Sequence, residues 1–232
     1  MNTLNVKIQM LLILFMGAYS QPYATEALYI ISNKKEVHVQ AIAHPDQFQG
    51  LDNQKNPMSG YHLLVWNQGR AASNALFTTT VSDSALHNAL IQIGAKPSNE
   101  LNLDTWDQRN NPKHPAPDQH VTGTPIDIDI QWPNQEAPQP LSDMITDTGG
   151  RRFDFRFGGH LANQSQWHSG CGVCLYSCPG GKISNAAYTV RDYVQKNTQF
   201  RIRPNVSLKN DTPVTLIFRI KETPHPMPTK EN

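Results

Sequence analysis

The chain has 232 residues, a formal net charge of +1 and a pI near 7.8. Because the charge is balanced and no basic stripe occurs, we expect neither a nucleic-acid partner nor attraction to an anionic membrane surface. The 17 prolines, 14 glycines and modest hydrophobic content of 38% favour a loop-rich fold dominated by β-sheet. The length allows one sizeable core or two small ones.

The N-terminus is typical of an export signal. A weakly basic start precedes the apolar run 10–20, which is too short to remain as a membrane-spanning helix, and Ala18, Ser20 and Ala24 fit cleavage sites. We therefore expect residues 1–24 to be a signal peptide, with a periplasmic or secreted mature protein and no integral membrane span after cleavage. The alternative is a short membrane anchor that stays attached.

Alternating apolar residues predict strands in the first part of the mature chain. Residues 27–32 and 36–43 are two such runs separated by the polar residues 33–35, which is a hairpin pattern. Residues 61–66 and 75–81 are rich in branched and aromatic side chains, which favour strand.

The clearest helix pattern covers residues 82–93. Ser82 can cap its N-terminus, while Leu86, Leu90 and Ile93 fall on one face and a glycine follows the last turn. The spacing therefore predicts one well-defined amphipathic helix.

Residues 102–123 are polar and proline-rich, and we expect them to form a long surface loop. Strict alternation over residues 124–132 then predicts a half-buried strand with Asp127 and Asp129 on its outer face. Two carboxylates on one face suit an acid–base pair or a metal site, but they equally suit a solvated strand face.

The remaining patterns complete the predicted fold. Residues 151–157 alternate again, and residues 213–221 form a strong strand that we expect to close the sheet. We predict an α+β fold in which residues 25–222 form a single domain of mostly antiparallel sheet. Residues 223–232 are expected to be a disordered tail.

All three cysteines lie in one short run, which ends in Pro179 and two glycines. Read from His168, the run is H-x2-C-x2-C-x3-C-P, with the ligand positions His168, Cys171, Cys174 and Cys178. This is the spacing of a bacterial iron–sulfur run with histidine in place of the first cysteine. We expect the run to form a loop on an excursion from the sheet.

Four interpretations of this run stay open. In the first, Cys171, Cys174 and Cys178 hold an iron–sulfur cluster, with His168, another residue or an exogenous group as the fourth ligand. In the second, the same four residues bind zinc or copper, although structural zinc sites usually draw their ligands from two separated pairs. In the third, Cys178 and one partner form a disulfide, which an exported chain favours. In the fourth, the three are structural thiols.

The neighbours of the run add candidate roles. Gly180 and Gly181 allow backbone amides to turn towards sulfur, which tunes a cluster's potential, and we take both as cofactor-binding candidates. Lys182 can lower the pKa of a thiol, but we expect it to be solvent-exposed. His160 is not expected to be a ligand.

The helix and the cysteine run together resemble the YdjY-like family of bacterial proteins. The residues that carry the resemblance are 85–97 (ALHNALIQIGAKP) and 170–185 (GCGVCLYSCPGGKISN), and it extends over roughly residues 28–220. The resemblance implies an exported protein with a ferredoxin-type cysteine motif. This chain departs from a full ferredoxin motif because a fourth cysteine is missing.

Two functional hypotheses follow. The first is a periplasmic redox or electron-transfer accessory protein with a metal centre, such as an iron–sulfur cluster, that acts with a redox partner protein. The alternative is a non-enzymatic binding or assembly module whose cysteine loop is stapled by a disulfide, with no cofactor or with zinc. Because H-E-x-x-H, G-x-S-x-G, P-loop and dinucleotide motifs are all absent from the sequence, we do not expect an enzyme acting on its own.

Overall fold

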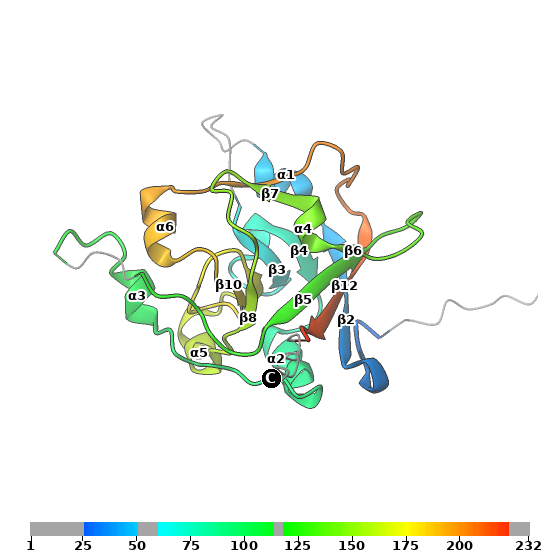
Figure 1. Cartoon of the computed structure of the whole chain (residues 1–232), viewed down its shortest axis with the longest axis horizontal. Helices are drawn as coiled ribbons and strands as arrows, with labels where there is room; N and C mark the ends of the chain where they lie inside the picture. Colours follow the sequence, from blue (N-terminus) through cyan, green and yellow to red (C-terminus); the bar gives the residue numbers. More distant parts are fainter. Residues whose placement is uncertain (1–25, 51–59, 114–117, 223–232) are drawn as a thin grey trace, which may run out of the picture.

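A computed structural model describes residues 26–50, 60–113 and 118–222 (Figure 1). The predicted signal peptide, residues 1–24, and the predicted tail, residues 223–232, lie outside the described residues. Within the described part of the chain, none of the helices has the length and apolar character that crossing a membrane requires.

Twelve strands dominate the described residues: β1 (Leu28–Ile31), β2 (Glu36–Ala43), β3 (His62–Trp66), β4 (Ala75–Thr79), β5 (Ile126–Gln131), β6 (Gln139–Pro140), β7 (Ile145–Asp147), β8 (Phe155–Phe157), β9 (Cys171–Cys174), β10 (Ile183–Asn185), β11 (Phe200–Ile202) and β12 (Pro213–Ile220). The α-helices are α1 (Pro45–Gln49), α2 (Asp83–Gln92), α3 (Leu103–Asp107), α4 (Leu141–Met144), α5 (Gln164–Trp167) and α6 (Val190–Gln195). Three short 3-10 turns are η1 (Ser32–Lys34), η2 (Ala72–Asn74) and η3 (Leu161–Asn163).

Ten of these strands form one sheet. Nine follow the order β6-β5-β12-β2-β4-β3-β9-β10-β8, and β1 pairs with β2 beside this path. Neighbours are antiparallel except for the pairs β3–β4 and β9–β10, which are parallel. Strands β7 and β11 form a separate antiparallel pair. The prediction of an α+β single domain with a mostly antiparallel sheet is therefore confirmed.

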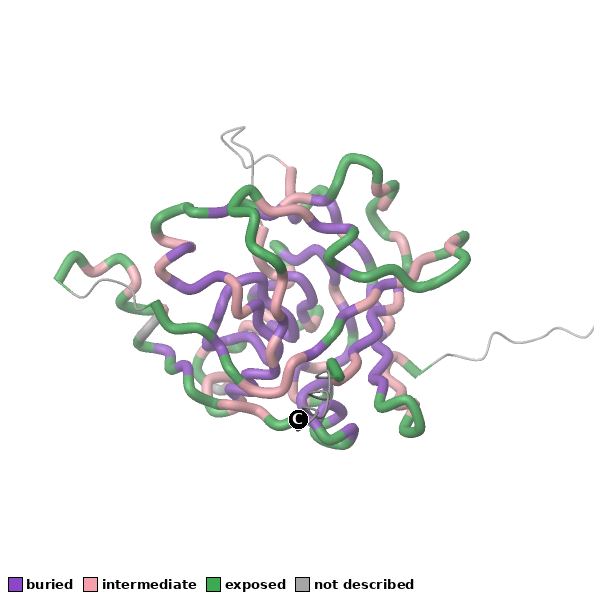
Figure 2. Tube along the Cα trace, viewed as in Figure 1, coloured by how far each residue is buried: buried purple, intermediate pink, exposed green. Residues whose placement is uncertain are grey.

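The sheet curls until its two ends meet. The amide of Phe157 in β8 donates to the carbonyl of Thr124, just before β5, over 2.9 Å, and Pro125 bridges to Arg156. Gly123 makes this approach possible, because its φ is +103° and a Cβ there would lie 2.2 Å from the Phe157 carbonyl oxygen. Buried residues accordingly concentrate inside the curved sheet, while the outer loops are exposed (Figure 2).

Several predicted elements are confirmed. The two runs at residues 27–32 and 36–43 form the antiparallel hairpin of β1 and β2. Helix α2 begins after Ser82, whose hydroxyl accepts a hydrogen bond from the Ala85 amide, and Leu86 and Leu90 are buried beneath it. This helix packs against β2 and β9.

Three expectations were wrong. Strand β12 does not close the sheet but lies inside it, between β5 and β2. The cysteine run is not an excursion from the sheet, because residues 171–174 form β9, an interior strand between β3 and β10. Within the segment expected to be a long polar loop, residues 103–107 form helix α3. Helix α6 was not anticipated, although Thr189 and Asp192 form a capping box at its start.

A buried ion pair joins helix α2 to the end of the cysteine run. Lys182 was expected at the surface, but its side chain and that of Asp83 are each only 1% exposed, and Lys182 Nζ lies 3.1 Å from Asp83 Oδ2. The other carboxylate oxygen of Asp83 accepts hydrogen bonds from Gln164 and the Ser84 amide. Each of these buried charges is stabilised by the other, because an isolated buried charge loses its hydration without compensation.

We predict that Lys182→Met lowers the free energy of unfolding by about 3–5 kcal/mol, because it leaves the Asp83 carboxylate buried without a counter-charge. Urea denaturation followed by circular dichroism measures the loss. The control is Lys221→Met in the exposed Lys221–Asp127 pair, whose side chains are 45% and 50% exposed. Its cost should stay below about 1 kcal/mol. Equal costs for the two variants would refute the role of the buried pair.

Candidate functional site

The cysteine run starts as a fully buried strand. All four residues of β9, from Cys171 to Cys174, are buried, with β3 antiparallel on one side and β10 parallel on the other. The pairing with β3 is irregular, since the register shifts on either side of Leu64. Such an irregularity re-aims side chains that would otherwise alternate strictly between the two faces of the sheet.

The irregular strand and the bend after it bring the three thiols together. The Cys174 thiol interacts with the thiols of both Cys171 and Cys178. All three cysteines are reduced in the structure and almost completely buried. The three cysteines are therefore neighbours through a strand and the bend that follows it rather than through a loop, and their role as metal ligands stays a prediction.

Backbone contacts fix the last cysteine. The Cys178 amide and carbonyl both contact the Ser184 hydroxyl of β10, at 3.4 and 3.3 Å. The Gly180 amide donates to Cys178 Sγ over 3.4 Å, which is the kind of amide-to-sulfur contact that the sequence suggested. The Gly181 amide instead donates to the Cys178 carbonyl oxygen. Gly180 has to be small, because a Cβ there would lie 2.8 Å from the Trp167 ring.

Burial keeps two of the thiols protonated. Desolvation, followed by the hydrogen bond to Cys171, raises the pKa of the Cys174 thiol well above its usual range. The hydrogen bond to Cys174, followed by desolvation, raises the pKa of the Cys178 thiol in the same way. Because the thiolate is the reactive form, neither group is an activated nucleophile at neutral pH.

A histidine from outside the cysteine run, His62, lies beside the cysteines. His62 pairs with Cys174 across β3 and β9, and the Cys178 sulfur acts on its charge. Its Nδ1 is buried without a hydrogen-bond partner among the described residues. Burial lowers the pKa of His62, so that its imidazole is neutral at pH 7. No motif points to this residue, since only the pairing of β3 with β9 places it there.

His168 and His160, the two histidines considered from the sequence, occupy different places. His168 is exposed, ends α5 in the left-handed region with φ +47°, and does not line the cavity beside Cys171 and Cys178. His160 is buried, and both of its ring nitrogens contact backbone groups, namely the Leu101 amide and the Gly181 carbonyl. His160 therefore holds the backbone around the cysteine run.

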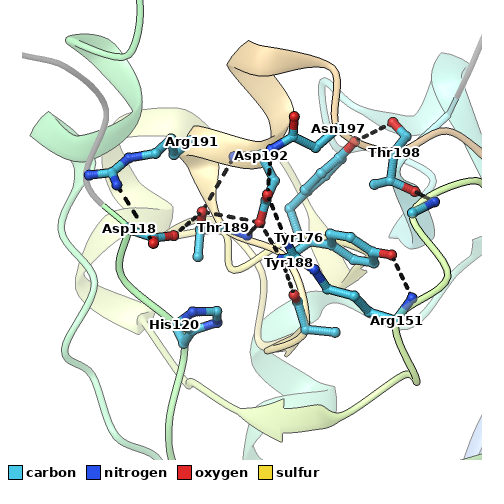
Figure 3. A network of polar contacts seen from close by, with 12 residues as sticks. Asp118, His120, Arg151, Tyr176, Tyr188, Thr189, Arg191, Asp192, Asn197 and Thr198 are labelled. Carbon is cyan, nitrogen blue, oxygen red and sulfur yellow. Dashed lines mark hydrogen bonds and ion pairs between the residues drawn. The ribbon is translucent and has the colours of Figure 1, made fainter.

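A polar network anchors the chain beyond the run (Figure 3). Arg151 donates to Asp192 over 2.8 Å, and Asn197 donates to the same carboxylate over 2.8 Å. Burial opposes the ionisation of Asp192, but the hydrogen bonds from Asn197, Thr189 and Arg151 outweigh it and lower its pKa. The Tyr176 hydroxyl donates to the Thr198 carbonyl oxygen over 3.2 Å. These contacts fix the segment that follows Cys174.

A cavity of about 270 Å³ opens beside the cysteine run. Cys171, Cys178 and His62 line it, whereas Cys174 does not. The cavity is slightly below the usual 300–1,000 Å³ range of small-molecule sites, which suits a small ligand. It therefore offers space next to two of the three sulfur atoms.

Aromatic rings form one wall of this cavity. Tyr61, Trp106 and Trp167 come from three separate segments, and the Trp106 ring lies 5.8 Å from Tyr61 and 6.0 Å from Trp167 between centroids. Arg109 stacks on Trp106, with its guanidinium carbon 4.5 Å from the ring centroid. The result is a cluster of aromatic side chains in a cavity that also contains polar groups.

A second, larger cavity of about 410 Å³ contains the two aspartates of β5. Asp129 forms an ion pair with Arg219, and Asp127 lies 3.7 Å from Lys221. Each carboxylate therefore has a cationic partner on β12 or directly after it. This arrangement matches the solvated strand face that the sequence allowed, rather than an acid–base pair.

The donor groups near the cavity can be compared with a metal site. Three thiols and one imidazole are ligands that zinc, copper and iron accept after deprotonation. Among the described residues, however, no group of three or more histidine, cysteine, aspartate or glutamate side chains is arranged so that it could hold a metal ion. The donor types fit a metal centre and their arrangement does not, so the metal ligands and the iron–sulfur cluster stay predictions.

Comparison with known proteins places this architecture in a family. A family model described as the YdjY domain matches residues 28–219, from β1 almost to the end of β12. The chain belongs to the YdjY family. The "Uncharacterized protein YdjY" of Escherichia coli strain K12 is 31% identical over 163 residues, covering 69% of this chain and 68% of that protein. No solved structure matches the YdjY domain described above.

The raised thiol pKa values predict a pH-dependent stability of the reduced protein. Above about pH 8.5, the usual pKa of cysteine, the unfolded chain loses thiol protons that the native state keeps. The free energy of unfolding should therefore fall as pH rises, by up to about 1.4 kcal/mol per pH unit for each of Cys174 and Cys178. Urea denaturation with reductant at pH 7.5, 8.5 and 9.5 measures the slope. The Cys174→Ala/Cys178→Ala variant should lose it, and an unchanged slope in this variant would contradict the assignment.

Proposed function

We propose that this YdjY protein is a non-enzymatic binding module that takes a small molecule into the cavity beside its cysteine run. The observation that carries the proposal is the cavity itself, which combines an aromatic wall with polar groups and two sulfur atoms. Small-molecule sites characteristically join apolar walls to a few placed polar groups. The residues Arg70, Asn74 and Ser169 supply such groups.

The proposal includes a disulfide between Cys174 and Cys178 that staples the run. Cys171 and Cys174 are the two ends of β9, which is paired on one side with β3 and on the other with β10. A disulfide requires Cα atoms less than about 7 Å apart, which extended backbone does not favour for residues three positions apart. Cys174 and Cys178 are separated instead by the bend at residues 175–176, and their thiols interact. Because neither thiol is stabilised as a thiolate, the reduced form gains no advantage from ionisation.

Formation of this staple is a two-electron oxidation. The two S–H bonds break, one S–S bond forms, and two protons and two electrons pass to a disulfide-bearing oxidant, which becomes two thiols. Cys171 is then the thiol left over, and it faces the cavity. The predicted export of the chain supports the oxidised form, because thiols oxidise readily outside the cytoplasm.

A second candidate is the redox or electron-transfer protein with a metal centre and a partner protein. The observation in its favour is the gathering of three thiols next to His62, whose Nδ1 lacks a hydrogen-bond partner among the described residues. His62, which lines the cavity with Cys171 and Cys178, then supplies the imidazole in place of the exposed His168. The arrangement of the donors argues against this candidate, because no group of three or more such side chains in the described part of the chain could hold a metal ion.

Thiol counting and metal analysis separate the two candidates. In air-exposed mature protein, we expect one alkylatable thiol per denatured chain, none in Cys171→Ser, and no stoichiometric metal. Mass spectrometry of peptides should locate the disulfide at Cys174 and Cys178. Iron with acid-labile sulfide, or zinc, at one site per chain in anaerobically purified protein would overturn the staple and support the metal centre.

A blocked cavity tests the binding function. Asn74 lines the cavity and is exposed, so Asn74→Trp should fill its mouth while the fold is preserved. Ligand-observed NMR with a mixed library of small fragments should find binders of the wild-type protein that lose at least tenfold in affinity in this variant. The matched control is Ser73→Trp, an exposed neighbour that does not line the cavity. Fragments that bind the wild-type protein and Asn74→Trp with equal affinity would refute the site.

A further inference from the structure

One of the polar residues that line the cavity, Arg70, is positively charged. Arg70 lines the cavity, and its guanidinium has neither an ion-pair nor a hydrogen-bond partner among the described residues. Several other arginines of the described chain are compensated; for example, Arg151 pairs with Asp192 and Arg156 pairs with Asp154. An arginine without a counter-charge at the edge of a cavity is a ready partner for a carboxylate or another planar anion.

No acidic side chain offsets this charge within the cavity. The described residues that line it include no aspartate and no glutamate. Asn74 and Ser169 add neutral hydrogen-bonding groups, and neither of them repels an anion. A cationic ligand would meet Arg70 without any carboxylate to hold it, so the cavity discriminates against positive charge.

A second observation concerns His62, which lines the same cavity. Its Nδ1 is buried away from the cavity and has no hydrogen-bond partner among the described residues. A neutral imidazole carries one N–H group, and with Nδ1 shielded that group is available to an anionic oxygen in the cavity from Nε2. His62 and Arg70 therefore offer two donors to one negatively charged group.

The aromatic residues of the cavity favour a ligand with a flat apolar part. The rings of Tyr61, Trp106 and Trp167 form a continuous apolar surface along the cavity. Flat aromatic groups stack on such surfaces with a gain beyond the area that they bury. The volume of about 270 Å³ limits the occupant to a small molecule.

From these observations we infer that the ligand of this cavity is a small anion with a planar or aromatic body, held by Arg70 and His62 against the aromatic wall. The inference rests on the proposed binding function and names the class of its ligand. Charge supplies the selectivity, and the aromatic wall contributes to affinity for any flat molecule.

Three probes of almost equal shape test the charge preference: benzoate, benzamide and benzamidine, which are anionic, neutral and cationic. Ligand-observed NMR titrations with the full mature protein give the affinities. We expect benzoate to bind at least tenfold more tightly than benzamide, and benzamidine to bind least. Arg70→Gln should reduce benzoate affinity about tenfold and leave benzamide affinity almost unchanged.

The matched control is Arg203→Gln. Arg203 is exposed and does not line the cavity, so the preference for benzoate should remain in this variant. Equal binding of all three probes, or a preference that survives Arg70→Gln, would overturn the anionic class while leaving the binding function intact. Absence of benzoate binding would also overturn it. Failure of the proposed binding function gives a different result: no fragment of the mixed library then loses affinity in Asn74→Trp.

Discussion

The structure depends on one requirement of the cysteine run, namely that its buried backbone must find hydrogen-bond partners. Burying three thiols also buries the amides and carbonyls around them, and each unpaired group would cost free energy. The fold meets this demand by making residues 171–174 an interior strand. Beyond that strand, Ser184, Asn185 and His160 supply partners for the bend and the turn. The positions of the sulfur atoms follow from this pairing.

Much of the fold could be predicted because its signals are local. The hairpin of β1 and β2 and the helix α2 follow from periodicity and from the cap at Ser82, which depend only on neighbouring residues. The order of strands depends on contacts distant in sequence, and the apolar residues of β12 look the same at an edge as in the interior. For the same reason, spacing alone made the cysteine run resemble a metal-binding loop, although β3 and β10 pair with it as a strand.

The site was predictable only in part. The sequence located the three cysteines and the glycines after them, but the cavity is assembled from segments that lie far apart in the chain. Tyr61 and His62 come from around β3, Trp106 from α3 and Arg70 from the turn after β3. No motif joins these residues, since a cavity wall needs shape and polarity rather than fixed spacing. Lys182 was misplaced because a lone lysine normally stays in water, and its partner Asp83 is distant in sequence.

The aromatic wall has a consequence for spectroscopy. Two of the four tryptophans of the chain, Trp106 and Trp167, border the same cavity. Indole emission responds to the polarity and to the quenching groups of its immediate surroundings, and here water in the cavity is replaced when a molecule enters. The protein thus carries an intrinsic optical reporter at this position, and occupancy can be followed by emission intensity and wavelength in unlabelled material.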